Sequence, residues 1–218
     1  MRKITFSQII IFSALMSIIF SLGIATTWLF LHIINLGDFK GITFATLGCI
    51  LIYLYAFVIY RLFLHFIPLP EGEVIKGSQG ELSAQINNLF YLLLFNTLIR
   101  THFLPTPLMR LIYLALGARM GSNTYSVGSI LDPPLTSFGA NCIVGHDAVV
   151  FCHVIEGQNF ALFPITVGNN VTIGAMAIIM PGVKISDGAI ISAGAVVLKG
   201  TSIGPNEIWA GVPAKRIK

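Results

Sequence analysis

Residues 167–203 read VGNNVTIGAMAIIMPGVKISDGAIISAGAVVLKGTSI, and this stretch decides the fold. A branched aliphatic residue recurs at every sixth position: Val167, Ile173, Ile179, Ile185, Ile191, Val197 and Ile203. Trp209 continues the same phase. A helix would require a period of about 3.6 and a half-buried hairpin strand a period of about 2. A period of six instead predicts one short strand and one turn per unit, with three units closing a triangular coil around an aliphatic column.

Small or β-branched residues hold a second fixed position, four residues after the aliphatic ones: Val171, Ala177, Val183, Ala189, Ala195 and Thr201. This position is expected at the crowded corner of the triangle. The same pattern runs earlier through Phe138, Val144 and Val150, but the step from Val150 to Val167 breaks the phase. Residues 156–166 are therefore predicted to leave the wall as a loop. An imperfect first coil is predicted from residue 116, interrupted around Asp132, and the total is about five coils of about 18 residues each.

The N-terminal part has a different composition. Hydrophobic residues make up 55% of the chain and charged residues 10%, against about 25% charged in ordinary soluble domains. No aspartate, glutamate, lysine or arginine lies in 4–37 or in 42–60. Because a helix of about 20 apolar residues crosses a bilayer, residues 1–67 are predicted to form a transmembrane helical hairpin.

The basic residues orient this hairpin. Arg2 and Lys3 precede the first span and Arg61 follows the second, whereas the connector carries only Lys40, offset by Asp38. The positive-inside rule then places both termini in the cytoplasm, so a multi-pass protein of the inner (cytoplasmic) membrane is expected. A cleaved signal peptide is the alternative for the first span, although its apolar stretch is long for that purpose.

Residues 68–115 are predicted to connect the two parts, with a polar linker over residues 71–86. The apolar patches Leu89–Ile99 and Leu108–Leu116 are too short to span a bilayer as separate helices. Two alternatives remain for them, helices lying in the membrane interface or helices packed on the soluble domain.

Other features narrow the class of function. The net charge is +4, but the basic residues are scattered, which argues against a nucleic-acid partner. The three cysteines, Cys49, Cys142 and Cys152, show no CxxC spacing, and their odd number argues against a disulfide framework. No metal is predicted.

Residues 116–218 resemble the hexapeptide-repeat acyltransferase superfamily, whose members fold as left-handed parallel β-helices. The resemblance is carried by VGNNVTIGA from Val167, IMPGVKI from Ile179, ISAGAVV from Ile191 and the closing WAGVPAKRI from Trp209. It implies a mainly β fold class, a homotrimer and a histidine base. It also implies an acyl-CoA donor as co-substrate, with acetyl-CoA as the leading candidate.

Three residues are predicted to be catalytic. His153 lies where the chain leaves a coil, as the catalytic histidine does in the resembling acetyltransferases, and would take the proton of the acceptor. Glu156 would orient its imidazole. His146, at a turn of the preceding unit, is the alternative base.

The resemblance also implies a donor site. Small residues would let the pantetheine arm approach the backbone, and basic residues would meet the CoA phosphates. The predicted set is Gly174, Ala175, Ala193, Gly194, Lys199, Lys215 and Arg216.

The predicted function is O- or N-acetyl transfer from acetyl-CoA to a saccharide or lipid-linked acceptor at the cytoplasmic membrane face. The loop after His153 is shorter and more apolar than in sugar acetyltransferases of the superfamily, which favours a larger or more lipidic acceptor. The main alternative is a non-catalytic, membrane-tethered trimeric scaffold in a polysaccharide or lipid synthesis complex. A zinc enzyme using His102, His146 and His153 fits the spacing poorly.

Overall fold

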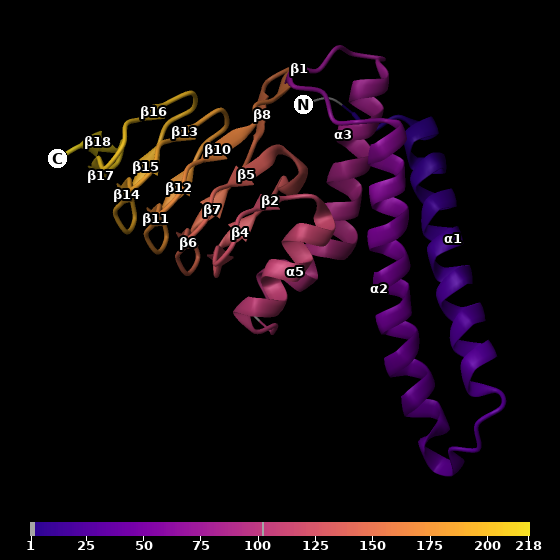
Figure 1. The fold of residues 1–218 in the computed structure, drawn as a ribbon. Helices are drawn as coiled ribbons and strands as arrows, with labels where there is room; N and C mark the ends of the chain where they lie inside the picture. The colour runs from indigo at the N-terminus through magenta and orange to yellow at the C-terminus, as the bar shows by residue number, and fades with distance from the viewer. Residues whose placement is uncertain (1–2, 102) are drawn as a thin grey trace.

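The computed structural model describes residues 3–101 and 103–218, so Arg2 and His102, which entered the arguments above, lie outside the described residues. The N-terminal half forms a group of helices and the C-terminal half a stack of short strands. The C-terminus lies at the end of the stack that is remote from the helices (Figure 1).

The stack is a parallel β-helix with three faces. The first face consists of β2 (Arg119–Met120), β5 (Thr136–Phe138), β10 (Ile165–Val167), β13 (Lys184–Ile185) and β16 (Ser202–Ile203). The second face consists of β3 (Tyr125–Ser126), β6 (Ile143–Val144), β11 (Thr172–Ile173), β14 (Ile190–Ile191) and β17 (Ile208–Ala210), with β18 (Lys215–Arg216) folded back antiparallel on β17. The third face consists of β4 (Ser129–Ile130), β7 (Val149–Val150), β12 (Ile178–Ile179) and β15 (Val196–Val197).

The aliphatic column that the six-residue period predicts is confirmed. Ile173 pairs in register with Val144 below it and Ile191 above it, and its side chain is 1% exposed. Corner residues such as Ala177 and Ala195 are fully buried. Gly174 is required by the stacking, because a Cβ there would collide with the backbone of Ala193 in the next coil.

The break in the repeat is an ordered hairpin. β8 (His153–Glu156) and β9 (Asn159–Leu162) pair antiparallel around Gly157, whose φ of +62° suits a glycine. A third strand, β1 (Gly72–Glu73), pairs with β9. The predicted loop over residues 156–166 therefore begins earlier, directly after β7. It is regular because β1 supplies backbone partners to β9.

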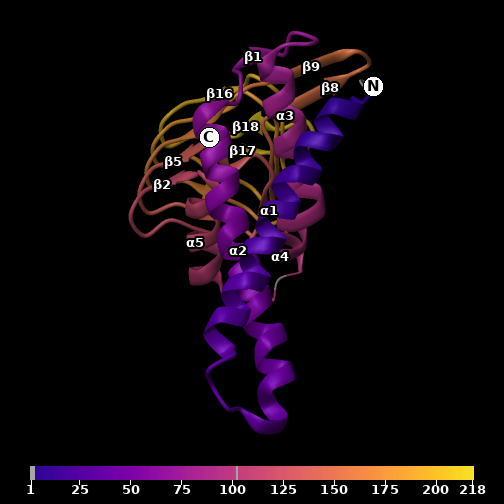
Figure 2. The same cartoon turned by 90° about the vertical axis from the view of Figure 1, so that its right-hand side faces the viewer.

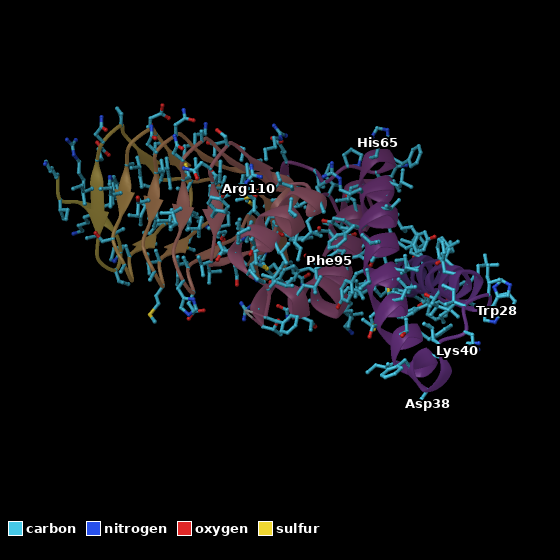
Figure 3. All side chains as sticks on the ribbon, turned by 60° about the horizontal axis from the view of Figure 1, so that its bottom comes forward. Trp28, Asp38, Lys40, His65, Phe95 and Arg110 are labelled. Atoms are coloured by element: carbon cyan, nitrogen blue, oxygen red, sulfur yellow. The ribbon has the colours of Figure 1, made fainter. Side chains whose placement is uncertain are left out.

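Two long helices form the predicted hairpin. These are α1 (Phe6–Leu31) and α2 (Lys40–Phe66), joined through the short helix η1 (Gly37–Phe39), with Asp38 and Lys40 at the far tip (Figure 3). A Cβ at Gly23 would collide with Ile52, so this glycine lets the two helices pack closely. Both helices are long and apolar enough to cross a membrane.

The structure corrects the interpretation of residues 71–86 as a linker and of 89–99 as a separate short helix. One continuous helical segment runs through α3 (Gln79–Phe90), the π-helical turn η2 (Tyr91–Phe95) and α4 (Asn96–Arg100). It begins early because the Ser78 hydroxyl accepts a hydrogen bond from the Glu81 amide at 3.1 Å. The 22-residue segment Gln79–Arg100 is also long and apolar enough to span a membrane, and half of it is buried inside the protein.

The helix α5 (Thr106–Leu116) covers the open end of the β-helix. Its Met109, Tyr113 and Leu116 are buried, and Tyr113 donates a hydrogen bond from its hydroxyl to the Gly128 carbonyl at 2.8 Å. Arg110, at the junction in Figure 3, donates to the carbonyl oxygens of Met120, Gly121 and Thr124. For the apolar patch Leu108–Leu116, the alternatives were a helix in the membrane interface and a helix packed on the soluble domain. The structure shows packing on the β-helix.

Candidate active site

The most pronounced polar arrangement in the β-helix is a pair formed by Asp132 and His153. The distance from Nδ1 of His153 to Oδ2 of Asp132 is 2.7 Å. The same carboxylate oxygen accepts hydrogen bonds from the backbone amides of Cys152 at 2.8 Å and His153 at 3.3 Å. Three donors therefore converge on one oxygen, which fixes both the carboxylate and the ring.

Two consecutive coils bring these residues together. Asp132 follows β4, and His153 follows β7, the strand that pairs with β4 in the next coil. Because Ile130 pairs with Val150, the segments that follow β4 and β7 leave the third face side by side. The short helix η3 (Pro133–Leu135) turns the chain directly after Asp132, while β8 carries His153 outward.

The environment of the pair suits a base. The Asp132 side chain is 2% exposed and the His153 side chain 30%. Burial lowers the pKa of His153, but the hydrogen bond and the negative charge of Asp132 outweigh it, so the pKa lies above its ordinary value. With Nδ1 donating its proton to Asp132, Nε2 is left to accept a proton from a substrate.

His153 lines a pocket of about 400 Å³. The pocket lies between the segment 79–100 on one side and the hairpin β8–β9 on the other. Figure 2 shows these elements side by side, next to the start of α1. Side chains of the helical segment that face it include Gln85, Asn88, Tyr91, Asn96 and Arg100.

The predicted partner of His153, Glu156, is not the one that the structure shows. Glu156 lies at the end of β8, and its carboxylate pairs with Lys199 at 2.6 Å. Both side chains are more than half exposed. The prediction failed because β8 is extended, which carries Glu156 away from the corner, while Asp132 reaches His153 from the preceding coil. Lys199, predicted to meet CoA phosphates, is thereby engaged by Glu156.

His146 and the predicted small residues gather at a different corner. His146 lies 3.3 Å from the carboxylate of its neighbour Asp147 and is 58% exposed. Ala175 of the next coil and Ala193 of the one after it continue this corner, since β6, β11 and β14 are stacked neighbours. The third face separates this corner from His153, so one chain does not bring the two groups together.

The fold itself accounts for two of the small residues. Gly174 is required by stacking, as described, and Gly194 has a φ of +69° with open space around it. At the end of the chain, Lys215 and Arg216 form β18, and Arg216 pairs with Glu207 at 3.0 Å. The role of these residues toward CoA stays a prediction.

The Cys152 side chain is fully buried, and burial, followed by the charge of Asp132, raises the pKa of its thiol. The three cysteines are free. Within residues 3–101 and 103–218, no group of three histidine, cysteine or carboxylate side chains could hold a metal ion.

Sequence reasoning missed Asp132, Tyr91 and Arg100 as site residues. Asp132 could have been found from the register of the first coil, because it lies two residues after Ile130 and hence beside Cys152. Tyr91 and Arg100 could not, since their approach to His153 depends on how the helical segment packs against β8–β9.

Comparisons with known proteins agree with the repeat. Residues 164–199 match the family model described as "Hexapeptide repeat of succinyl-transferase". The putative acetyltransferase YvoF of Bacillus subtilis (strain 168) is 37% identical over 81 residues, which cover 35% of this chain and 47% of that protein. The galactoside O-acetyltransferase of Escherichia coli (strain K12) is 52% identical over 56 residues, covering 26% of this chain and 27% of that protein.

A solved galactoside acetyltransferase in complex with coenzyme A is similar with a TM-score of 0.45 and 24% identity, covering 67% of this chain and 85% of that one. The chain thus spans about half of the first relative's length and about a quarter of the second's. Together with the repeat, the family model and the two sequence relatives support the hexapeptide-repeat acetyltransferase superfamily for the β-helix.

Proposed function

We propose that this protein is an acyl-CoA-dependent acyltransferase, specifically an acetyltransferase, with His153 as its general base. The single observation that carries the proposal is the hydrogen bond between Asp132 and His153 at the wall of a pocket. The names of the curated relatives, which are acetyltransferases, support the reaction class.

The chemistry follows from the geometry of the pair. Nε2 of His153 removes the proton from an acceptor hydroxyl or amine as the acceptor atom attacks the thioester carbonyl. The buried Asp132 stabilises the imidazolium that forms, and its hydrogen bond keeps the ring in the correct orientation. The carbon–sulfur bond then breaks, and the CoA thiolate leaves with the proton from the imidazolium.

The donor site proposed for this reaction is the groove of small residues around Gly174, Ala175, Ala193 and Gly194, with Lys215 and Arg216 toward the phosphates. Because the third face separates that corner from His153, a donor lying there would reach a His153 of a neighbouring copy more readily than that of its own chain. This separation supports the homotrimer as part of the proposal, since an assembled site would join the two corners.

The proposed location is the cytoplasmic face of the inner membrane. The exposed apolar surface of α1 and α2 supports it: Trp28 is 57% and Phe30 63% exposed, although both are large apolar side chains. A bilayer around the hairpin would cover them. The proposed acceptor is correspondingly a saccharide or lipid-linked molecule.

The test is transfer of labelled acetyl groups from acetyl-CoA by the full chain in detergent, with membrane extract as the source of acceptor. His153→Ala is expected to lower turnover by about 10²- to 10⁴-fold, the contribution of a general base. His65→Ala, an exposed histidine at the end of α2, serves as the matched control. Turnover that survives in His153→Ala but is lost in His146→Ala would transfer the role to His146. If the wild type neither binds acetyl-CoA nor transfers acetyl groups, the alternative of a non-catalytic, membrane-tethered scaffold is favoured.

A further inference from the structure

We infer that the pocket beside His153 is the acceptor site, and that it takes the headgroup of an anionic, lipid-borne acceptor whose phosphate or carboxylate binds Arg100. The inference rests on the proposed function for its chemistry, but the site itself is argued from the helical segment 79–100. This segment has no part in the hexapeptide repeat.

Arg100 supplies the charge. It is the last residue of α4, it is exposed, and it lines the same pocket as His153. Among the ion pairs of the described residues, none involves Arg100. A guanidinium binds phosphate or carboxylate with paired, charge-assisted hydrogen bonds, so an anionic group is the partner that this side chain fits.

Tyr91 supplies a second polar contact. Its side chain lines the pocket, and its hydroxyl is buried with no hydrogen-bond partner among the described residues. Arg100 lies close enough to act on that hydroxyl through its charge and through a side-chain hydrogen bond that is too loose to meet strict geometric limits. Tyr91 also opens the π-helical turn η2, a distortion that is frequent at functional sites. A buried hydroxyl without a partner costs free energy unless a ligand satisfies it.

Another part of the lining is apolar. Leu89 and Leu92 of the helical segment, Ile4 before α1, and Ile155 and Phe160 of the hairpin β8–β9 form this part. Leu92 is 61% exposed, so the apolar wall continues onto the outer surface of the helix. This apolar part favours the first carbons of a lipid tail, which a free, water-soluble sugar lacks.

Size and position complete the argument. A volume of about 400 Å³ is at the lower end of the range for small-molecule sites, about 300–1,000 Å³, and accommodates a headgroup rather than a whole lipid. Ile4, which precedes α1, lines the pocket, so the pocket lies near the start of the first long helix. A lipid-borne headgroup can reach His153 there while its tail stays beside the helices.

Binding is tested first, with probes of defined charge on the full chain in dodecyl maltoside. Dodecyl phosphate, dodecyl glucoside and inorganic phosphate are compared by thermal shift titration, using wild type, Arg100→Gln and Tyr91→Phe. Dodecyl phosphate is expected to bind wild type, and Arg100→Gln is expected to weaken it about tenfold or more, since hydrogen bonds to charged groups are among the stronger ones. Tyr91→Phe is expected to weaken it about threefold to tenfold. Arg119→Gln, an exposed arginine on the first face, is the matched control.

Three results would overturn the inference. The first is equal binding of dodecyl phosphate by Arg100→Gln and wild type, and the second is equal binding of dodecyl glucoside and dodecyl phosphate by wild type. The third is tight binding of inorganic phosphate alone, which would indicate a soluble anion instead of a lipid. The transfer assay separates this inference from the proposed function. With both correct, Arg100→Gln raises the KM for the lipid fraction and leaves the KM for acetyl-CoA unchanged. Transfer that does not depend on Arg100 removes the acceptor site only. Binding that depends on Arg100 in a protein that transfers nothing removes the proposed function only.

Discussion

Asp132→Asn isolates the contribution of one negative charge to the proposed base. One carboxylate oxygen of Asp132 accepts all three hydrogen bonds, from Nδ1 of His153 at 2.7 Å and from the amides of Cys152 and His153 at 2.8 and 3.3 Å. An asparagine side chain can place its carbonyl oxygen at the same point and keep all three. The substitution therefore removes the charge and leaves the local geometry in place.

The magnitude follows from the strength of a hydrogen bond to a charged group, about 1.5–3 kcal/mol. When the imidazolium forms during proton transfer, Asp132→Asn loses this stabilisation. A tenfold change in rate corresponds to about 1.4 kcal/mol, so kcat/KM is expected to fall about 10- to 150-fold. The assay is acetyl transfer across a pH series, with thermal unfolding as the check on folding.

The pH profile gives a second readout with a fixed sign. Asp132 raises the pKa of His153, and the base acts only when it is unprotonated. Removing the charge lowers that pKa, so the acidic limb of the profile should move to lower pH while the plateau rate falls. Asp187→Asn, which removes an exposed carboxylate near Asn169, should change neither. An unchanged plateau, or an acidic limb displaced to higher pH, would refute the assignment of Asp132 and His153 as a catalytic pair.

Three further outcomes are expected. Glu156→Gln should change kcat by less than about fivefold, because its exposed pair with Lys199 contributes about 1 kcal/mol at most. A loss as large as that of Asp132→Asn would restore Glu156 as the orienting residue. Ile179→Ala, at a fully buried position in the column, should lower the free energy of unfolding by about 2–5 kcal/mol in urea titrations. Because the folded pKa of His153 is raised, its pairing stabilises the fold below the unfolded pKa of about 6.5 and this contribution is lost as pH rises through the folded value. The stability advantage of wild type over His153→Gln should therefore shrink between pH about 5.5 and about 8.5, and a constant difference would contradict it.

The β-helix was predictable because its determinant is local and repeated. Each unit places Val or Ile inward and a small residue at the corner, so stacking adds the same contact at every coil, as Ile173, Ile191 and Ala195 illustrate. The exit of the chain at His153 was also predictable, because the break in the period marks it. The regular hairpin at that break was not, since β9 depends on pairing with β1, about ninety residues earlier in the chain.

The site was only partly predictable for the same reason. His153 stands at a local feature of the repeat, whereas its partner is chosen by the register between two coils. Glu156 is near in sequence but is carried away by β8, and Asp132 is distant in sequence but adjacent in the stack. Leu89–Ile99 was interpreted as a short apolar patch because its pattern begins there. The helix actually begins at Gln79, where Ser78 caps it, and this extension brings Gln85 to the pocket.

The arrangement joins three segments of different origin at one corner of the β-helix. Consecutive coils supply Asp132 and His153, the interruption of the repeat supplies the hairpin β8–β9, and β1 ties that hairpin to the end of α2. The aromatic cluster of Tyr60, Phe90 and Phe95, with ring centroids 5.2–5.9 Å apart, then holds the segment 79–100 against α2. A β-helix alone could place the proposed base, but only the helices give that base a walled pocket. If the proposed acceptor site is correct, the choice of acceptor is a property of the N-terminal half of the chain, and relatives that share only the repeat need not share it.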